Sequence, residues 1–196
     1  MDPSRLLPLF LDLHDRDVLV VGAGNVAARK VRDFIEAGAK VRVVATAAIP
    51  EIEARAKNGE IRLDLRSFED RDVDDAWLVV SATGAPDVEA RVYTAAEHQK
   101  KFVIAVDDLA SGSAASGAVI RRPPFVVAIS SSAELPAMTR LLREILERAL
   151  PEDRWIREAR DLRAKWKRQK TPMASRFEEL VRAVSDARSD APPPRR

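Results

Sequence analysis

Short apolar runs alternate with segments of helical periodicity over the first half of the chain. Five runs rich in β-branched residues have the composition of strands: 18–21, 41–45, 61–65, 77–81 and 102–106. Three of the intervening segments have helix-forming composition and apolar residues at helical spacing: 26–37, 49–57 and 87–99. Strands that are apolar along their whole length, joined by helices, predict a parallel sheet with both faces covered. We therefore expect a doubly wound α/β fold.

The pattern changes after residue 106. Residues 107–117 are rich in Ser, Ala and Gly and predict a long turn of the kind that often carries function. The runs 118–121 and 125–130, joined by an Arg-Pro-Pro turn, predict a hairpin, and 135–150 has the period of an amphipathic helix. Two smaller helical patterns follow. We expect a sheet domain, a hairpin-and-helix module, a helical module and a disordered tail, over residues 1–113, 114–150, 151–187 and 188–196.

The junction between the first strand and the first helix reads Gly22-Ala23-Gly24-Asn25-Val26-Ala27. In a Gly-x-Gly-x-x-Ala turn the first glycine allows a tight bend, the second lets the backbone approach a pyrophosphate, and the third position stays small where helix packs on strand. The start of the helix presents unpaired N–H groups and a partial positive charge to that phosphate. This context favours a nucleotide-binding, Rossmann-like turn; a tight βα turn that binds nothing is the alternative.

Composition narrows the possible classes of function. The chain has 196 residues and no cysteine, which excludes disulfides, thiolate nucleophiles and cysteine-based metal centres, so redox chemistry would belong to a bound cofactor. No apolar run is long enough to span a membrane, and we expect a cytoplasmic protein without a membrane partner. Residues 151–196 carry a net charge of +5, but they lack aromatic interleaving and any nucleic-acid motif, so we expect no nucleic-acid partner.

Several further stretches occur in the order typical of one family. They are Leu7-Pro8-Leu9-Phe10, the glycine turn continued by Arg29-Lys30, the run from Gly38 to Ala45, Ala82-Thr83, Val106-Asp107-Asp108, and the region from Pro136 through Arg143-Glu144 to Leu150. In these stretches the chain resembles the precorrin-2 dehydrogenases of sirohaem synthesis, a family that includes the N-terminal part of bifunctional sirohaem synthase. The resemblance covers residues 6–185.

The resemblance implies an enzyme that oxidises precorrin-2 to sirohydrochlorin with NAD, by hydride transfer from the tetrapyrrole to nicotinamide. It also implies a homodimer whose C-terminal modules interlock. Some relatives insert ferrous iron as well, so a bifunctional dehydrogenase and ferrochelatase is one alternative. A non-catalytic NAD(P)-sensing module is the other.

The expected cofactor site follows the first, second and fourth strands. Gly22, Gly24, Asn25 and Val26 are expected at the pyrophosphate. The resemblance places Thr46 and Ala47 at the adenosine end, and Thr83 follows the fourth strand at the same edge. No acidic residue ends the second strand to bind a ribose 2′-hydroxyl. Nearby Arg42 is suited to a 2′-phosphate, but a solvated arginine at the sheet edge is the preferred interpretation, and Thr83 could equally cap the next helix.

The resemblance assigns the catalytic position to Asp107, which directly follows the fifth strand. Loss of hydride from precorrin-2 is accompanied by loss of a proton, and a carboxylate is a suitable acceptor. Asp108 and Ser131 are expected at the substrate; the alternatives are a turn cap for the aspartates and a helix N-cap for the serine. No metal site is expected, because neither His14 nor His98 has a second ligand at metal spacing.

The chain departs from the family pattern on the side expected to face the substrate. Ile104 replaces an asparagine, Ala133 and Glu134 replace a glycine pair, and residues 114–117 replace Phe-Ile-x-Pro. These changes are compatible with altered tetrapyrrole specificity, with loss of chelatase activity, or with nucleotide binding without catalysis.

Overall fold

The computed structural model describes residues 6–106, 112–131, 135–151 and 153–189. Its largest element is a five-stranded sheet with the strand order β3-β2-β1-β4-β5, in which every neighbouring pair is parallel. The strands are β1 (Asp17–Val21), β2 (Lys40–Ala45), β3 (Arg62–Leu65), β4 (Leu78–Ser81) and β5 (Phe102–Ala105). The chain order reverses between β1 and β4, where ligands of open α/β sheets bind.

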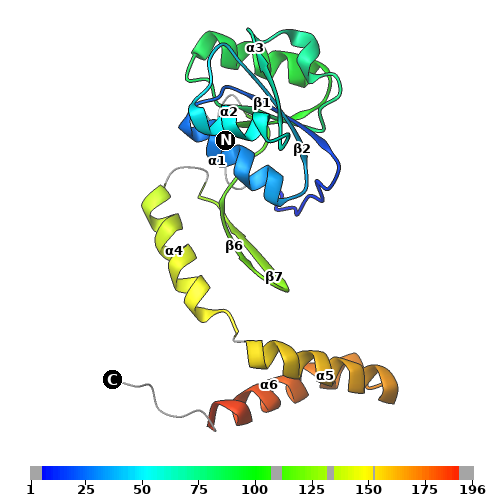
Figure 1. The fold of residues 1–196 in the computed structure, drawn as a ribbon. Helices are drawn as coiled ribbons and strands as arrows, with labels where there is room; N and C mark the ends of the chain where they lie inside the picture. The colour runs from blue at the N-terminus through cyan, green and yellow to red at the C-terminus, as the bar shows by residue number, and fades with distance from the viewer. Residues whose placement is uncertain (1–5, 107–111, 132–134, 152, 190–196) are drawn as a thin grey trace. The chain divides into compact units, whose positions relative to one another are not determined.

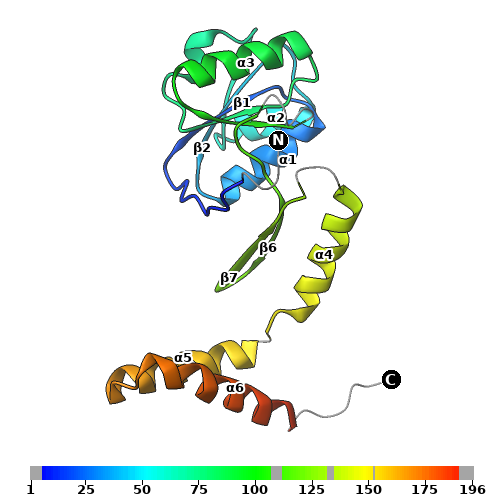
Figure 2. The same cartoon turned by 180° about the vertical axis from the view of Figure 1, so that it is seen from behind.

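Helices cover both faces of this sheet (Figures 1 and 2). They are α1 (Asn25–Glu36), α2 (Pro50–Lys57) and α3 (Pro86–His98), with a short 3-10 helix, η2 (Asp70–Val73), before β4. The doubly wound α/β fold predicted from the sequence is confirmed. Most helices and strands begin or end one residue away from the predicted position; β4, for example, begins at Leu78 rather than at residue 77.

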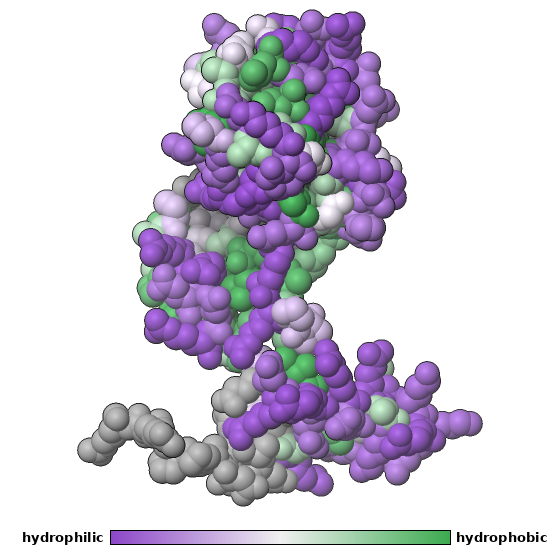
Figure 3. Space-filling view, in the orientation of Figure 1, coloured by the Kyte–Doolittle hydropathy of each residue, from purple (hydrophilic) through white to green (hydrophobic). Residues whose placement is uncertain are grey.

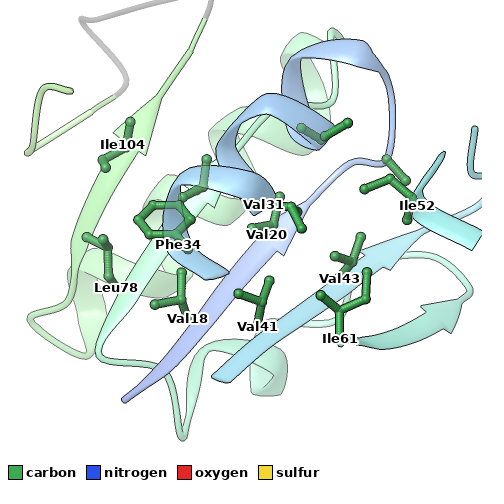
Figure 4. Packing of buried hydrophobic residues seen from close by; sticks show 14 residues of the cluster. Val18, Val20, Val31, Phe34, Val41, Val43, Ile52, Ile61, Leu78 and Ile104 are labelled. Atoms are coloured by element: carbon green, nitrogen blue, oxygen red, sulfur yellow. The ribbon is translucent and has the colours of Figure 1, made fainter. Parts of the chain in front are cut away.

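Two apolar clusters, one on each face, hold the sheet between its helices. One packs Val31 and Phe34 of α1 against Val18, Val20 and other residues of the sheet (Figure 4). The second packs α3 and η2 against the opposite face. Burying a side chain of this size contributes on the order of 2 kcal/mol, so these clusters supply much of the stability that fixes the strand ends.

Helix α1 ends at a left-handed glycine. Gly38 has φ +76°, its N–H donates to the carbonyl of Ile35 at 2.9 Å, and the N–H of Ala39 donates to the carbonyl of Phe34 at 3.0 Å. A side chain is strained at such a φ, which is why glycine ends the helix and turns the chain toward β2.

Part of the predicted long turn pairs with β5. The N–H groups of Ser113 and Ala114 both donate to the carbonyl of Val103 at 2.9 Å, and Ala114 forms a parallel bridge with Ile104. The Ser113 hydroxyl accepts from the N–H of Val103 at 3.0 Å. Residues 112–114 therefore run beside β5. The predicted antiparallel hairpin, β6 (Ala118–Arg122) with β7 (Phe125–Ile129), follows.

Three helices complete the described chain: α4 (Pro136–Ala149), α5 (Asp153–Gln169) and α6 (Met173–Ser189). The chain divides into two compact units, residues 1–143 and 144–196. In the second unit α5 packs on α6, and the indole N–H of Trp166 donates to Glu179 at 2.8 Å. Among the helices of the described ranges, none is long and apolar enough to cross a membrane.

Candidate functional site

The carboxyl ends of the parallel strands gather the predicted cofactor residues at one edge of the sheet. Gly22 directly follows β1, Thr46 and Ala47 follow β2, and Thr83 follows β4. Gly22 is buried, Thr83 is half-buried, and Thr46 and Ala47 are exposed. Parallel pairing places these ends side by side, so the structure brings four predicted residues, which follow three different strands, to a common edge.

Gly22 lies where the turn after β1 touches the turn after β4. Its φ is +108°, and a Cβ at this position would lie 2.1 Å from the carbonyl oxygen of Ala82 and 3.1 Å from the backbone nitrogen of Thr83. Its N–H donates to the carbonyl of Val44 on β2 at 2.9 Å. Only glycine fits this backbone, and the contact fixes the spacing of the two turns at the point where the strand order reverses.

Gly24 is the N-cap of α1 and has different surroundings. Its backbone is extended, with φ −87° and ψ −172°, and a Cβ there would meet no atom of the described residues within 4 Å. No side chain caps the helix, and its first turn holds no acidic residue. The first N–H groups of α1, from Asn25 and Val26 onward, are thus left without a side-chain cap at a helix start with partial positive charge, an arrangement suited to a phosphate.

Two arginines, Arg42 within β2 and Arg66 directly after β3, are paired with one buried carboxylate. Arg66 donates to both carboxylate oxygens of Asp72, at 2.8 and 2.5 Å, whereas Arg42 lies 3.3 Å from that carboxylate and donates to the backbone carbonyl of Asp72 at 2.5 Å. Burial by itself raises the pKa of Asp72, but bonds from Arg66 and the N–H of Glu69, with the charges of both arginines, hold it below its usual value. Arg42 is thus partly buried in an ion-pair network, not solvated at the sheet edge as preferred from the sequence.

Thr83 and Glu89 form a small polar cluster at the turn after β4. The Thr83 hydroxyl accepts from the N–H of Ala85 at 3.1 Å and lies 3.3 Å from the Glu89 carboxylate. The same carboxylate oxygen accepts from the N–H of Gly84 at 3.1 Å, although Glu89 is only 7% exposed. The Thr83 hydroxyl therefore bonds within the turn before α3, whose N-cap is Ala85 and which has no side-chain cap, so the capping alternative is wrong. Thr83 remains beside Gly22.

The predicted catalytic aspartate follows β5 in the sequence. Asp107 and Asp108 lie outside the described residues. The chain on either side of them is fixed: the N–H of Val106 donates to the carbonyl of Ser81 at 3.2 Å, and residues 112–114 run beside β5.

A lysine of α1, the helix that begins at the glycine turn, is bonded to the segment that follows residues 107–111. The Lys30 ammonium donates to the hydroxyl of Ser116 at 2.5 Å. Burial lowers the pKa of Lys30, and Arg29 adds to this effect while Asp33 opposes it. Ser116 lies in residues 114–117, where the sequence departs from the family pattern. One of the substituted residues therefore makes the bond to Lys30.

Ser131, predicted at the substrate, lies at the start of α4. Its hydroxyl accepts from the N–H of Leu135 at 3.3 Å and from the hydroxyl of Thr139 at 2.7 Å. These bonds are those of a residue that orders a helix start.

Two cavities formed by the described residues lie away from the carboxyl edge of the sheet. One, of about 480 Å³, lies between η2 and α3 and is lined by residues such as Asp74, Arg91 and His98. The other, of about 320 Å³, lies at the amino ends of β1, β2 and β3. Among the predicted site residues that the structure describes, none lines either cavity. Within the described part of the chain, no group of three or more His, Asp or Glu side chains is placed to hold a metal ion.

Glu89 and Asp72 were not identified as candidates from the sequence. A signal for Glu89 exists: the buried positions of α3 are Glu89, Val92 and Ala96, so a glutamate occupies an apolar stripe at helical spacing. Asp72 has no comparable signal, because the run Asp70-Arg71-Asp72 resembles a solvated turn and its arginine partners come from other elements.

Comparisons with known proteins agree with this geometry. Residues 9–118 match the model of the NAD_binding_7 family, described as NAD(P)-binding. Curated proteins named siroheme synthase, from Salmonella dublin and Salmonella typhimurium, are each 40% identical to the chain over 172 residues, which is 87% of this chain and 38% of theirs. A solved structure titled "SirC, precorrin-2 dehydrogenase" matches the fold with a TM-score of 0.73 at 24% identity, over 91% of this chain and 89% of that one.

The chain thus spans about two fifths of the length of these curated relatives. The similar fold of the solved structure extends over the sheet, the hairpin and the C-terminal helices.

Proposed function

The chain belongs to the NAD_binding_7 family of NAD(P)-binding domains, and from this premise we propose that it uses NAD to oxidise precorrin-2 to sirohydrochlorin in sirohaem synthesis. The names of its relatives, siroheme synthase and precorrin-2 dehydrogenase, support the choice of substrate. A cytoplasmic location is part of the same proposal.

The open space beside Gly24 supports the proposal that the chain binds a dinucleotide cofactor. A Cβ at Gly24 would meet nothing within 4 Å, although the extended backbone there would accept any residue. The protein itself gives no steric reason for glycine at this position, whereas a pyrophosphate in contact with the backbone gives one. The uncapped first turn of α1 supplies N–H donors to the same place.

NAD is proposed over NADP because Arg42 of β2 and Arg66, which follows β3, are engaged with Asp72 rather than with the adenosine end of the site. A 2′-phosphate requires a free cation beside the adenosine ribose. Arg42 and Arg66 are both bonded to Asp72, which leaves Thr46 and backbone groups to meet the ribose hydroxyls.

Asp107 is proposed to accept the proton that precorrin-2 loses. The oxidation removes two electrons and two hydrogens: one hydrogen leaves as hydride, for which bound NAD is the acceptor, and the other leaves as a proton. Asp107 follows β5 in the sequence, and the carboxyl end of β5 lies at the same edge of the sheet as those of β1 and β4, which supports a carboxylate there as the proton acceptor. Asp108 and Ser131 are proposed to position the tetrapyrrole.

A homodimer is part of the proposal, because α4 has an apolar face and no buried residue. Six apolar side chains at helical spacing are each at least 40% exposed: Leu135, Met138, Leu141, Leu142, Ile145 and Leu146. Apolar residues also lie on the surface in the region of α4 and the hairpin (Figure 3). An isolated helix of this kind gains stability when a second copy covers it.

A steady-state assay with purified protein, precorrin-2 and either NAD or NADP tests the function. We expect NADH absorbance at a rate that the Asp107→Asn variant lowers by about 100-fold or more, with binding of NAD unchanged. Activity that persists in Asp107→Asn would contradict the role of this residue.

The same protein distinguishes the two alternatives. A sensor would bind NAD without turnover of precorrin-2. A bifunctional enzyme would also accelerate iron insertion into sirohydrochlorin in the absence of NAD.

A further inference from the structure

Glu89 is a buried carboxylate beside the proposed cofactor site. It is 7% exposed and lies in the first turns of α3. Among the ion pairs of the described residues, none joins it to a lysine or arginine. Burying a charge costs free energy unless hydrogen bonds or nearby positive charge offset it.

The partners of this carboxylate all belong to the turn after β4. One oxygen accepts from the N–H of Gly84 at 3.1 Å and faces the Thr83 hydroxyl at 3.3 Å. Gly84 has φ +66°, so the turn is held in a left-handed conformation at its centre. These bonds explain an acceptor at this position. The amide oxygen of glutamine would accept the same bonds, so the negative charge itself is favoured by the start of α3, in whose first turn Glu89 lies.

The strand order places the nicotinamide half of a bound dinucleotide at this turn. The pyrophosphate is assigned to α1, directly after β1, and the adenosine half to Thr46 and Ala47, after β2. Because β4 lies on the other side of β1, the remaining half of the molecule extends toward Ala82 and Thr83. The contact between Gly22 and these two residues fixes that turn against the site.

Oxidised nicotinamide carries a positive charge on its ring, and the reduced ring is neutral. A carboxylate held in a partly desolvated turn attracts the first and not the second. We propose that the buried Glu89 carboxylate makes the site bind the oxidised cofactor more tightly than the reduced one, which rests on the proposed use of NAD. Such a preference favours loading of the oxidant and release of NADH after hydride transfer.

The test is calorimetric titration of the full chain with NAD, NADH and ADP-ribose, which lacks the nicotinamide. For the wild type we expect tighter binding of NAD than of NADH. In Glu89→Gln, which keeps the hydrogen bonds, affinity for NAD should fall on the order of tenfold while NADH and ADP-ribose bind as before. Glu97→Gln removes the same charge from an exposed position of α3 and should leave all three affinities unchanged.

Each other outcome overturns the inference in a recognisable way. If Glu89 has only a structural role, Glu89→Gln should lower the affinity for NAD, NADH and ADP-ribose together. Should Glu89→Gln fail to fold, the wild type alone decides, because NADH binding as tight as or tighter than NAD binding contradicts the inference. Failure of the wild type to bind any of the three would instead contradict the proposed function itself.

Discussion

Lys30 and Ser116 are 86 positions apart in the sequence and are joined by a hydrogen bond of 2.5 Å. The bond connects α1, which begins at the glycine turn, to the segment that follows residues 107–111. It thus couples the proposed cofactor side of the site to the chain next to the proposed catalytic aspartate.

Replacing Lys30 with Met keeps the apolar stem and removes the donor. Because burial already disfavours the charged ammonium, as the lowered pKa of Lys30 indicates, we expect the free energy of unfolding to change by about 1 kcal/mol or less. The KM for precorrin-2 should rise severalfold with the Kd for NAD unchanged. Steady-state kinetics and titration measure the two, with Lys57→Met, at an exposed position of α2, as control. An unchanged KM would show that the bond does not act on the substrate side.

The two glycines of the turn should respond oppositely to alanine. In Gly22→Ala a Cβ meets the carbonyl of Ala82 at a positive φ, and we expect a loss of about 3 kcal/mol or more in urea unfolding. Gly24→Ala meets no protein atom, so its stability should stay within about 1 kcal/mol of the wild type. Its affinity for NAD should nevertheless fall about tenfold or more. Normal NAD binding by a stable Gly24→Ala protein would show that the pyrophosphate does not bind at this turn.

Asp72 should make the stability of the sheet depend on acid pH. Its pKa is lowered in the folded chain, so its contribution is complete above the unfolded value of about 3.9 and is lost as pH falls through that value and below. At pH 7 we expect Asp72→Asn to cost about 3 kcal/mol, because Arg66 and Arg42 lose the negative charge of their buried ion-pair partner. The difference from wild type should shrink below about pH 4.

Urea unfolding at several pH values measures this dependence. Asp75→Asn, three residues along at an exposed position, is the matched control and should show little effect. A constant difference between Asp72→Asn and wild type from pH 7 to pH 3 would exclude the network as its source.

The α4 face should control oligomeric state. Leu142→Glu places a charge in the exposed apolar stripe, and we expect it to raise the dimer Kd by roughly 100-fold. Arg148→Glu, on the same helix but outside the stripe, should leave the dimer intact. Light scattering after gel filtration distinguishes the species. A wild type that is monomeric at micromolar concentration would refute the dimer directly.

The sheet could be predicted because its residues carry a periodic signal. Apolar strands alternate with helices that have small or apolar residues at regular spacing, such as Ala27, Val31 and Phe34 of α1. The glycine turn was predictable for a different reason, also local: the backbone geometry at Gly22 requires glycine.

The polar contacts could not be predicted in this way. The bonds Lys30–Ser116 and Arg66–Asp72 depend on which elements meet in space, and no local pattern encodes them. The strand-like run of residues 112–114 was hidden because a segment rich in Ser, Ala and Gly has turn composition, while its pairing with β5 is a tertiary contact.

Anaerobic mixing of the protein with precorrin-2 and NAD, recorded as full spectra over time, tests the central claim most directly. NADH absorbance and the sirohydrochlorin spectrum should rise together in a one-to-one ratio for the wild type, and both should be strongly slowed in the stable Gly24→Ala variant. Formation of sirohydrochlorin without NADH, or neither product from a protein that binds NAD, would contradict the account.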